Sequence, residues 1–124
     1  MTNTRVLIVE DDESIRTLYS EALSLAGLVV DTAATGTEDV TLALEQHPDV
    51  ILMDITLPDI SGHKAVEKIR LDKWGRTAKV IFLTNHSDPK NIAEAVAGGS
   101  EEYIIKVHAT PKEVVNTVRT VSNS

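Results

Sequence analysis

The sequence predicts an α/β domain of the doubly wound class, in which helices cover both faces of a parallel sheet. Short apolar runs rich in β-branched residues alternate along the chain with segments of helical period. The runs are almost continuously apolar, which indicates strands that are covered on both faces. No repeat, low-complexity tract or linker divides the chain, so we expect one (βα)5 domain over residues 1–124.

Five apolar runs are the expected strands of this sheet. They are residues 6–9 (VLIV), 28–34 (LVVDTAA), 50–55 (VILMDI), 79–84 (KVIFLT) and 103–107 (YIIKV). In a doubly wound sheet the binding crevice lies outside the carboxyl ends of the strands, where the strand order reverses. We therefore expect the functional side chains at the ends of these runs.

The first and the last helical segments each show one apolar face that we expect to be buried. In the first segment its members are Ile15, Leu18, Ala22, Leu25 and Ala26. In the last segment they are Val114, Val115, Val118 and Val121. Gly27 suits the end of the first helix, because glycine adopts the left-handed conformation common there without strain.

Helix starts are predicted by capping boxes and by proline. Thr35 with Glu38, and Thr110 with Glu113, have the residue types and spacing of capping boxes. A proline follows both Asp88 and Thr110, where it would occupy the first helical position. We therefore expect helices to begin at these three places.

The composition excludes several classes of function. Cysteine is absent, which excludes disulfides, thiolate catalysis and cysteine-ligated metals and suits a reducing compartment. The formal net charge is −7, with 19 acidic residues against 12 Lys and Arg, which disfavours direct binding to nucleic acid. No apolar run approaches the roughly 18 residues of a membrane span. We expect a cytoplasmic protein without membrane contact.

Acidic residues gather where the first and third predicted strands end. Glu10, Asp11 and Asp12 follow the first strand, and Asp54 lies near the end of the third. Two carboxylates about 4 Å apart repel by about 4 kcal/mol at an effective dielectric of about 20. A raised pKa, splaying into water or a bound cation would each relieve this repulsion. Because hard oxygen ligands and a phosphate oxygen suit Mg²⁺, we expect a Mg²⁺ site.

The other strand ends offer groups that suit a phosphoryl group beside that metal. Asp54 could act as a carboxylate nucleophile, and its product would be an aspartyl-phosphate. Lys106, near the end of the fifth strand, could pair with one phosphoryl oxygen. Thr84, at the end of the fourth, could donate a hydrogen bond to another. Such a transfer would rest on positioning and charge neutralisation.

Four motifs, in this order along the chain, resemble the response-regulator receiver domain of two-component signalling. They are LIVEDD at the first strand, ILMDITLPDISG around Asp54, FLT ending at Thr84, and AGGSEEYIIK with Tyr103 and Lys106. The resemblance covers nearly the whole chain. Within the family, the chain is similar to single-domain regulators of the chemotaxis type. It implies a flavodoxin-like sheet with the strand order 2-1-3-4-5.

By this resemblance, Asp54 is the phosphoacceptor. It would take a phosphoryl group from a phosphohistidine on a sensor histidine kinase or a histidine phosphotransfer protein. The implied Mg²⁺ ligands are Asp12 and Asp54 directly, the backbone carbonyl of Thr56, and Asp11 through water. The resemblance implies a domain that catalyses only its own phosphoryl uptake and loss, and that is not an enzyme acting on another substrate.

Thr84 and Tyr103 are the switch pair that the resemblance implies. On phosphorylation, Thr84 would move toward the phosphoryl oxygen and Tyr103 would swing inward, which changes the face of the fourth helix, fifth strand and fifth helix. A downstream protein with higher affinity for the phosphorylated face would then read the signal. Thr56 and His86 occupy positions that tune the phosphoryl lifetime in the family.

Two residues depart from the family pattern. Val107 replaces the proline that usually follows the lysine, and since a cis bond before valine costs about 2.5–4 kcal/mol, we expect a trans bond. Asn85 replaces a small residue after the switch threonine and could narrow access to the site. Both departures motivate an alternative, a receiver-like domain that is not phosphorylated and only presents an interaction surface. The retention of every charged site residue argues against it.

Two further alternatives concern the chemistry and the assembly. A phosphatase with an aspartate nucleophile usually carries a second aspartate after the same strand and a cap over its substrate, and this short chain offers neither.

Valines of the last helix, if exposed, could form a homodimer or partner face. We assign structural roles to five other residues: a turn at Asp59, a covered core edge at Trp74, and surface positions at His47, His63 and His108.

Overall fold

The structure, a computed structural model, describes residues 4–55, 57–84, 102–105 and 110–123. For Thr84 and for residues 102–105 it describes the backbone alone. Several predictions therefore lie outside the described residues: those for Thr56, Asn85, His86, the helix start after Asp88, Lys106, Val107 and His108.

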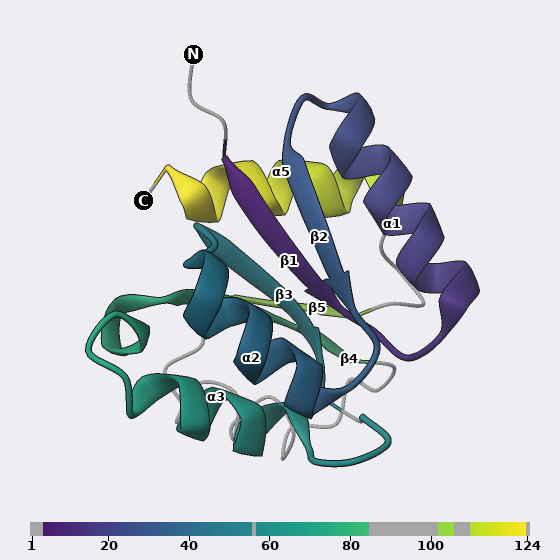
Figure 1. The fold of residues 1–124 in the computed structure, drawn as a ribbon. Coiled ribbons are helices and arrows are strands. Elements are labelled where there is room, and N and C mark those ends of the chain that lie inside the picture. The colour runs from purple at the N-terminus through teal and green to yellow at the C-terminus, as the bar shows by residue number, and fades with distance from the viewer. Residues whose placement is uncertain (1–3, 56, 85–101, 106–109, 124) are drawn as a thin grey trace.

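The described elements follow the predicted alternation of strands and helices (Figure 1). The strands are β1 (Arg5–Val9), β2 (Val29–Ala33), β3 (Val50–Asp54), β4 (Lys79–Thr84) and β5 (Glu102–Ile105). The helices are α1 (Glu13–Leu25), α2 (Gly36–Gln46), α3 (Gly62–Arg70), the short 3₁₀ helix η1 (Gly75–Thr77) and α5 (Pro111–Ser122).

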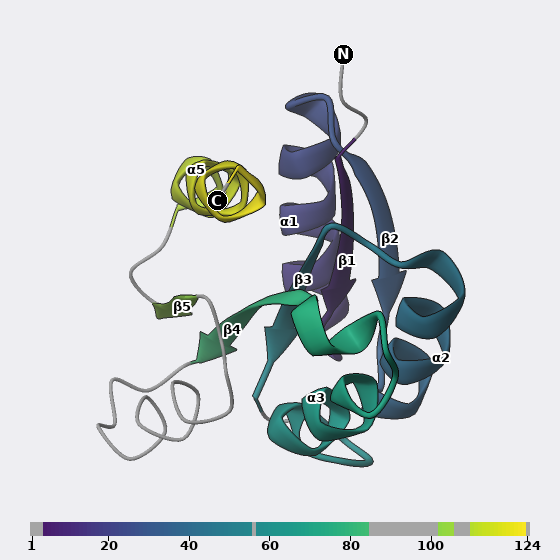
Figure 2. The same ribbon diagram turned by 90° about the vertical axis from the view of Figure 1, so that its left-hand side faces the viewer.

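The five strands form one parallel sheet in the order β2-β1-β3-β4-β5, which confirms the predicted fold class and strand order. Helices α1 and α5 cover one face of the sheet, and α2 and α3 cover the other (Figures 1 and 2). The strand order reverses between β1 and β3. The carboxyl ends of these two strands are therefore the expected place for a site.

Two apolar clusters, one on each face of the sheet, form the core. The side chains of β1 and β3 alternate between the clusters because successive residues of a strand point to opposite faces. The cluster beside α2 and α3 includes Leu7, Val9, Ile51 and Met53. The cluster beside α1 and α5 includes Val6, Ile8, Val50 and Leu52. Burying each of these side chains stabilises the fold by roughly 1.5–3 kcal/mol, which anchors both central strands.

The buried face of α1 differs from the prediction. Leu18 and Leu25 are 49% and 89% exposed, whereas Tyr19 and Leu23 are buried in the cluster with α5. Three residues of the predicted face do pack there: Ile15, Ala22 and Ala26. The real face combines them with Tyr19 and Leu23 at helical spacing. The sequence pattern favoured the two leucines over a tyrosine, although the tyrosine ring buries more apolar surface.

The valines of α5 are buried, which confirms the predicted apolar face and contradicts the alternative of exposed valines. Each of these valines is at most 8% exposed; they are Val114, Val115, Val118 and Val121. They pack in the cluster that also contains residues of α1, which makes them core residues and removes them as a homodimer face. Arg119 adds a polar link between the two helices, because its Nη2 donates to the carbonyl oxygen of Ala26 at 2.8 Å.

The predicted caps of α2 and α5 are confirmed. The Thr35 hydroxyl accepts a hydrogen bond from the backbone N–H of Glu38 at 3.1 Å. The Thr110 hydroxyl accepts one from the N–H of Glu113 at 3.2 Å, and proline begins α5. The Glu38 carboxylate accepts from the N–H of Ala34 at 3.4 Å, one residue before the position expected for a capping box.

Candidate functional site

Three carboxylates meet at the carboxyl ends of β1 and β3. Oxygen atoms of Glu10, Asp11 and Asp54 all lie within 4.8 Å of one another. This follows from the register, since Val9 pairs with Met53 on the neighbouring strand and the chain continues from both into acids. Glu10 and Asp54 are buried, at 1% and 6% exposure, and Asp11 is exposed. The group therefore has two interior members and one that faces solvent.

Backbone contacts hold the first of these acids in place. The N–H of Glu10 donates to the carbonyl oxygen of Ala33 at 3.0 Å, which extends the pairing of β1 with β2 by one residue. The Glu10 carboxylate accepts from the N–H of Asp12 at 3.2 Å. Arg16, in the first turns of α1, donates from Nη1 to the Glu10 carbonyl oxygen at 2.9 Å. Arg16 was not among the predicted site residues, although a basic residue one turn after an acidic run was a usable signal.

Asp12 caps the first helix. Its side chain accepts a hydrogen bond from the N–H of Ile15 at 3.0 Å and forms the N-cap of α1. Asp12 is exposed and is not among the three clustered carboxylates. The structure therefore brings Glu10, and not Asp12, together with Asp11 and Asp54, and the Asp12 carboxylate is turned to the start of α1.

The chain after Asp54 folds back closely on the strand end. The N–H of Ile55 donates to Leu83 of β4 at 3.1 Å, and the N–H of Gly62 donates to the Ile55 carbonyl oxygen at 2.7 Å. A Cβ atom on Gly62 would lie 2.4 Å from the backbone oxygen of Asp54, so only glycine fits there without displacement. The start of α3 is therefore packed against the backbone of Asp54.

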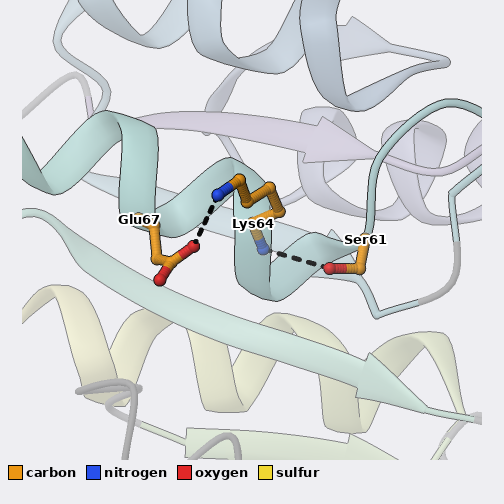
Figure 3. Close-up of polar contacts among 3 residues, drawn as sticks. All are labelled: Ser61, Lys64 and Glu67. Atoms are coloured by element: carbon orange, nitrogen blue, oxygen red, sulfur yellow. Dashed lines mark hydrogen bonds and ion pairs between the residues drawn. The ribbon is translucent and has the colours of Figure 1, made fainter.

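Figure 3 shows how α3 begins directly after this loop. The Ser61 hydroxyl accepts a hydrogen bond from the backbone N–H of Lys64 at 3.1 Å and caps the helix. The Lys64 ammonium lies 3.4 Å from a Glu67 carboxylate oxygen, with both side chains more than half exposed (Figure 3). An exposed pair of this kind contributes about 0–1 kcal/mol, so the cap and the close packing at Gly62 do more to fix the loop.

The backbone places β4 beside the acidic strand end. Asp54 pairs with Leu83, and Thr84 is the next residue of β4. Thr84 in turn pairs with Ile105 of β5, the residue before Lys106. The side chains of Thr84 and Tyr103 lie outside the described part of the structure, so their predicted roles stay predictions.

The predictions for the other rings and for Asp59 have mixed outcomes. Trp74 packs on the core cluster beside α2 and α3, as predicted, and stacks on the exposed His47 with 4.5 Å between ring centroids. His63 is half-buried against Phe82, so its predicted surface position is wrong. Asp59, predicted only to shape its turn, accepts hydrogen bonds from two backbone N–H groups of α2.

The clustered carboxylates fit a hard divalent cation. All three groups offer oxygen atoms only, and their negative charges repel one another unless a cation or protons compensate them. Mg²⁺ uses few carboxylates and keeps several waters, which agrees with a site that has one exposed edge at Asp11. The residues present therefore fit Mg²⁺ by donor type and by separation.

Comparison with known proteins identifies the family. The profile of the response regulator receiver domain matches residues 6–119. The chain belongs to this family. It is a receiver domain of two-component signalling, which confirms the resemblance predicted from the four motifs.

Relatives of this receiver domain include proteins of similar length. DivK, the polar-differentiation response regulator of Brucella ovis, is 35% identical over 107 residues, which are 86% of this chain and 87% of DivK. The solved structure of chemotaxis response regulator CheY4 of Vibrio cholerae has a TM-score of 0.90 and 31% identity, with 97% of this chain and 99% of CheY4 covered.

A third relative was solved with metal bound. The receiver domain of the sensor histidine kinase PA1611 from Pseudomonas aeruginosa PAO1 has a magnesium ion coordinated in its active-site cleft. It has a TM-score of 0.90 and 28% identity, with 99% of this chain and 100% of that chain covered.

Other relatives are longer than this chain. The chain spans 46%, 22% and 44% of the length of three curated relatives, so the similarity to them concerns the matched part alone. Within the described ranges, no helix combines the length and the apolar character needed to cross a membrane. The cytoplasmic location stays a prediction.

Proposed function

We propose that this receiver domain is a phosphorylation-switched signalling module in which Asp54 accepts the phosphoryl group. The observation that supports this most strongly is the meeting of the Glu10, Asp11 and Asp54 carboxylates at the switch point of the sheet. Asp54 ends β3, and the backbone around it is fixed by the bonds of Ile55 and Gly62. A carboxylate held in this way is a suitable nucleophile.

Mg²⁺ would be held by Glu10, Asp11 and Asp54, with the predicted carbonyl of Thr56 as a further ligand. This set replaces the predicted one, because Asp12 caps α1 and Glu10 lies with the other acids. When bound, the cation neutralises the carboxylates and the incoming phosphoryl oxygens. The magnesium ion in the related PA1611 receiver domain supports this choice of metal.

In the proposed transfer, an Asp54 carboxylate oxygen attacks the phosphorus atom of a phosphohistidine. A P–O bond forms, the P–N bond breaks, and the imidazole nitrogen keeps the electron pair of the broken bond. An ionised carboxylate needs no general base for this step, so the chain contributes position and charge neutralisation. Thr84 and Lys106 keep their predicted roles as phosphoryl-stabilising groups.

The donor would be a sensor histidine kinase or a phosphotransfer protein. The output would be a second protein that binds the phosphorylated form more tightly, read through the predicted pair Thr84 and Tyr103. We propose no turnover of another substrate. The alternative of an interaction domain without phosphorylation, which Asn85 and Val107 favour in the sequence, is an outcome of the following test.

The deciding experiment is intact-mass analysis after incubation with Mg²⁺ and acetyl phosphate, or with a phosphohistidine donor. We expect one added phosphoryl group on the wild-type chain and none on Asp54→Asn or in excess chelator. Asp72→Asn is a matched control, since Asp72 is an exposed acid in the turn after α3. If the wild-type chain takes up no phosphoryl group from either donor, the proposal is refuted in favour of the alternative, an interaction domain that is not phosphorylated.

A further inference from the structure

The loop between β3 and α3 makes a second contact, away from Asp54, with the first turn of α2. Both carboxylate oxygens of Asp59 take part: Oδ1 accepts from the N–H of Gly36 at 2.8 Å, and Oδ2 accepts from the N–H of Thr37 at 2.9 Å. The Thr37 hydroxyl also donates to Oδ2. This hydroxyl is the main cause that holds the pKa of Asp59 well below its usual range, so the carboxylate is ionised at neutral pH.

Close packing accompanies these hydrogen bonds. A Cβ atom on Gly36 would lie 2.4 Å from Cγ1 of Ile60 and 3.0 Å from its Cδ1, so the start of α2 and the loop touch without room for a methyl group. The other end of the loop is held at Gly62, whose N–H binds Ile55 at 2.7 Å beside the backbone of Asp54. The loop is therefore fixed by α2 at one point and by the strand end at another.

We propose that Asp59 is a positioning residue for the metal site, which holds the β3–α3 loop in the arrangement that Mg²⁺ binding needs. Asp59 is not one of the three clustered carboxylates, so it would act through the loop and not as a ligand. If the link to α2 is cut, the loop samples more conformations, and metal binding must order it at a cost in affinity. This inference rests on the proposed function of Asp54.

The charge of Asp59 offers a competing explanation. Removing this carboxylate would weaken the binding of a cation by Coulomb's law even if the loop stayed in place. Gly36→Ala separates the two explanations, because it leaves the charge intact and places a methyl group against Ile60. Thr37→Val also keeps the charge, and it removes one hydrogen bond of the link.

The test is a Mg²⁺ titration followed by the backbone amide signals in NMR spectra of the full chain. For Asp59→Ala we expect a dissociation constant about 10-fold higher, the lower end for groups that orient metal ligands. For Gly36→Ala we expect the same direction and a smaller change, since the Ile60 side chain can partly move aside. Asp72→Ala is the control, because its carboxylate also accepts a backbone N–H, from Trp74 at 2.9 Å. We expect no change there.

Phosphoryl uptake adds a readout that a general loss of stability would not reproduce. In Asp59→Ala the Mg²⁺ concentration for half-maximal uptake should rise about 10-fold, while the rate at saturating Mg²⁺ stays within about twofold. If Mg²⁺ affinity falls in Asp59→Ala but is unchanged in Gly36→Ala and in Thr37→Val, the effect is due to charge and the proposal is overturned. If Asp59→Ala does not fold, Asp59→Asn serves, since it keeps one oxygen acceptor.

Hydrogen exchange of the Gly62 amide, measured without Mg²⁺, separates this proposal from the proposed function. We expect about 10-fold faster exchange of this amide in Asp59→Ala than in the wild-type chain, since its bond to Ile55 reports the loop position. Unchanged exchange would overturn the positioning role even if the chain binds Mg²⁺. A wild-type chain that binds no Mg²⁺ would refute the metal site, and faster Gly62 exchange would then still show that Asp59 holds the loop.

Discussion

The buried acids of the described residues occupy two very different surroundings. Glu10 and Asp54 lie beside a third carboxylate at an edge that Asp11 opens to solvent. Asp39 lies alone on α2, fully buried, and within the described chain neither of its carboxylate oxygens has a hydrogen-bond partner. Burial raises the pKa of Asp39 to about 8.

The difference shows two ways to tolerate buried negative charge. Crowded acids at an accessible edge can be compensated by a cation, which turns their repulsion into a binding site. A single acid in an apolar interior has only a proton available, so it stays neutral near pH 7 and offers nothing to a ligand. Grouping and access, more than burial, therefore separate the candidate site from Asp39.

The largest expected effect is on stability, at Asp39. Its pKa is higher in the folded chain than the usual 3.8, so the folded state holds the proton more tightly than the unfolded state. This contribution to stability is complete below about pH 4 and is lost as the pH rises through about 8. Asp39→Ala should raise the free energy of unfolding at pH 7–8 by about 2–4 kcal/mol and flatten its fall with pH.

Urea unfolding between pH 5 and pH 9 measures this effect. Glu45→Ala is the matched control, an exposed acid on the same helix, and its profile should follow that of the wild-type chain. Asp39→Asn should also lose the pH dependence, because the amide does not ionise. A wild-type slope retained in both Asp39 variants would show that this carboxyl is already paired or hydrated.

The next effect concerns the acids that we propose as metal ligands. Glu10→Gln removes a clustered carboxylate, and we expect Mg²⁺ affinity to fall at least 10-fold. Asp12→Asn keeps a good N-cap and should change Mg²⁺ affinity less than about twofold. Titration of both variants against the wild-type chain ranks the two residues. The reverse ranking would restore Asp12 as the ligand.

A neutral hydrogen bond at an exposed helix start gives a smaller effect. Thr110→Ala removes the hydroxyl that accepts from Glu113 and should lower the free energy of unfolding by about 1 kcal/mol. Thr110→Ser keeps the cap and should lose much less. Thermal or urea unfolding checks this, and equal losses in both variants would assign the effect to the threonine methyl group.

The smallest effect is expected for the exposed ion pair in Figure 3. Lys64→Ala or Glu67→Ala should change stability by less than about 0.5 kcal/mol, because water screens charges on side chains that are 59% and 70% exposed. A double-mutant cycle in urea measures the coupling. A coupling of several kcal/mol would contradict the view that solvent access sets the cost of charge in this chain.

The apolar pattern was sufficient to predict the parallel sheet, and the resemblance to the receiver family predicted its strand order. Apolar runs such as residues 50–54 are long enough, and apolar enough, to specify buried parallel strands. Capping at Thr35 and Thr110 was also predictable, because one hydroxyl and the following backbone determine it. The positive φ of 91° at Gly27 likewise agrees with its predicted place after α1.

The errors arose where three-dimensional context decides between neighbouring residues. Glu10 and Asp12 are both acids after β1, and only the path of the chain shows which one caps α1. Asp39 looks like an ordinary polar helix residue, yet it shares the buried side of α2 with Ala43. Asp59 binds a helix 22 residues away in sequence, which no local pattern encodes.

The stack of Trp74 on His47 gives this chain a built-in optical probe. Trp74 is the only tryptophan, its ring lies at 8° to the imidazole, and His47 is the residue at which α2 ends. Indole fluorescence therefore arises at one known place, and a charged imidazole in contact with the ring would quench it. A movement of the end of α2 relative to Trp74 should therefore change the fluorescence emission of the indole, and no attached label is needed to detect it.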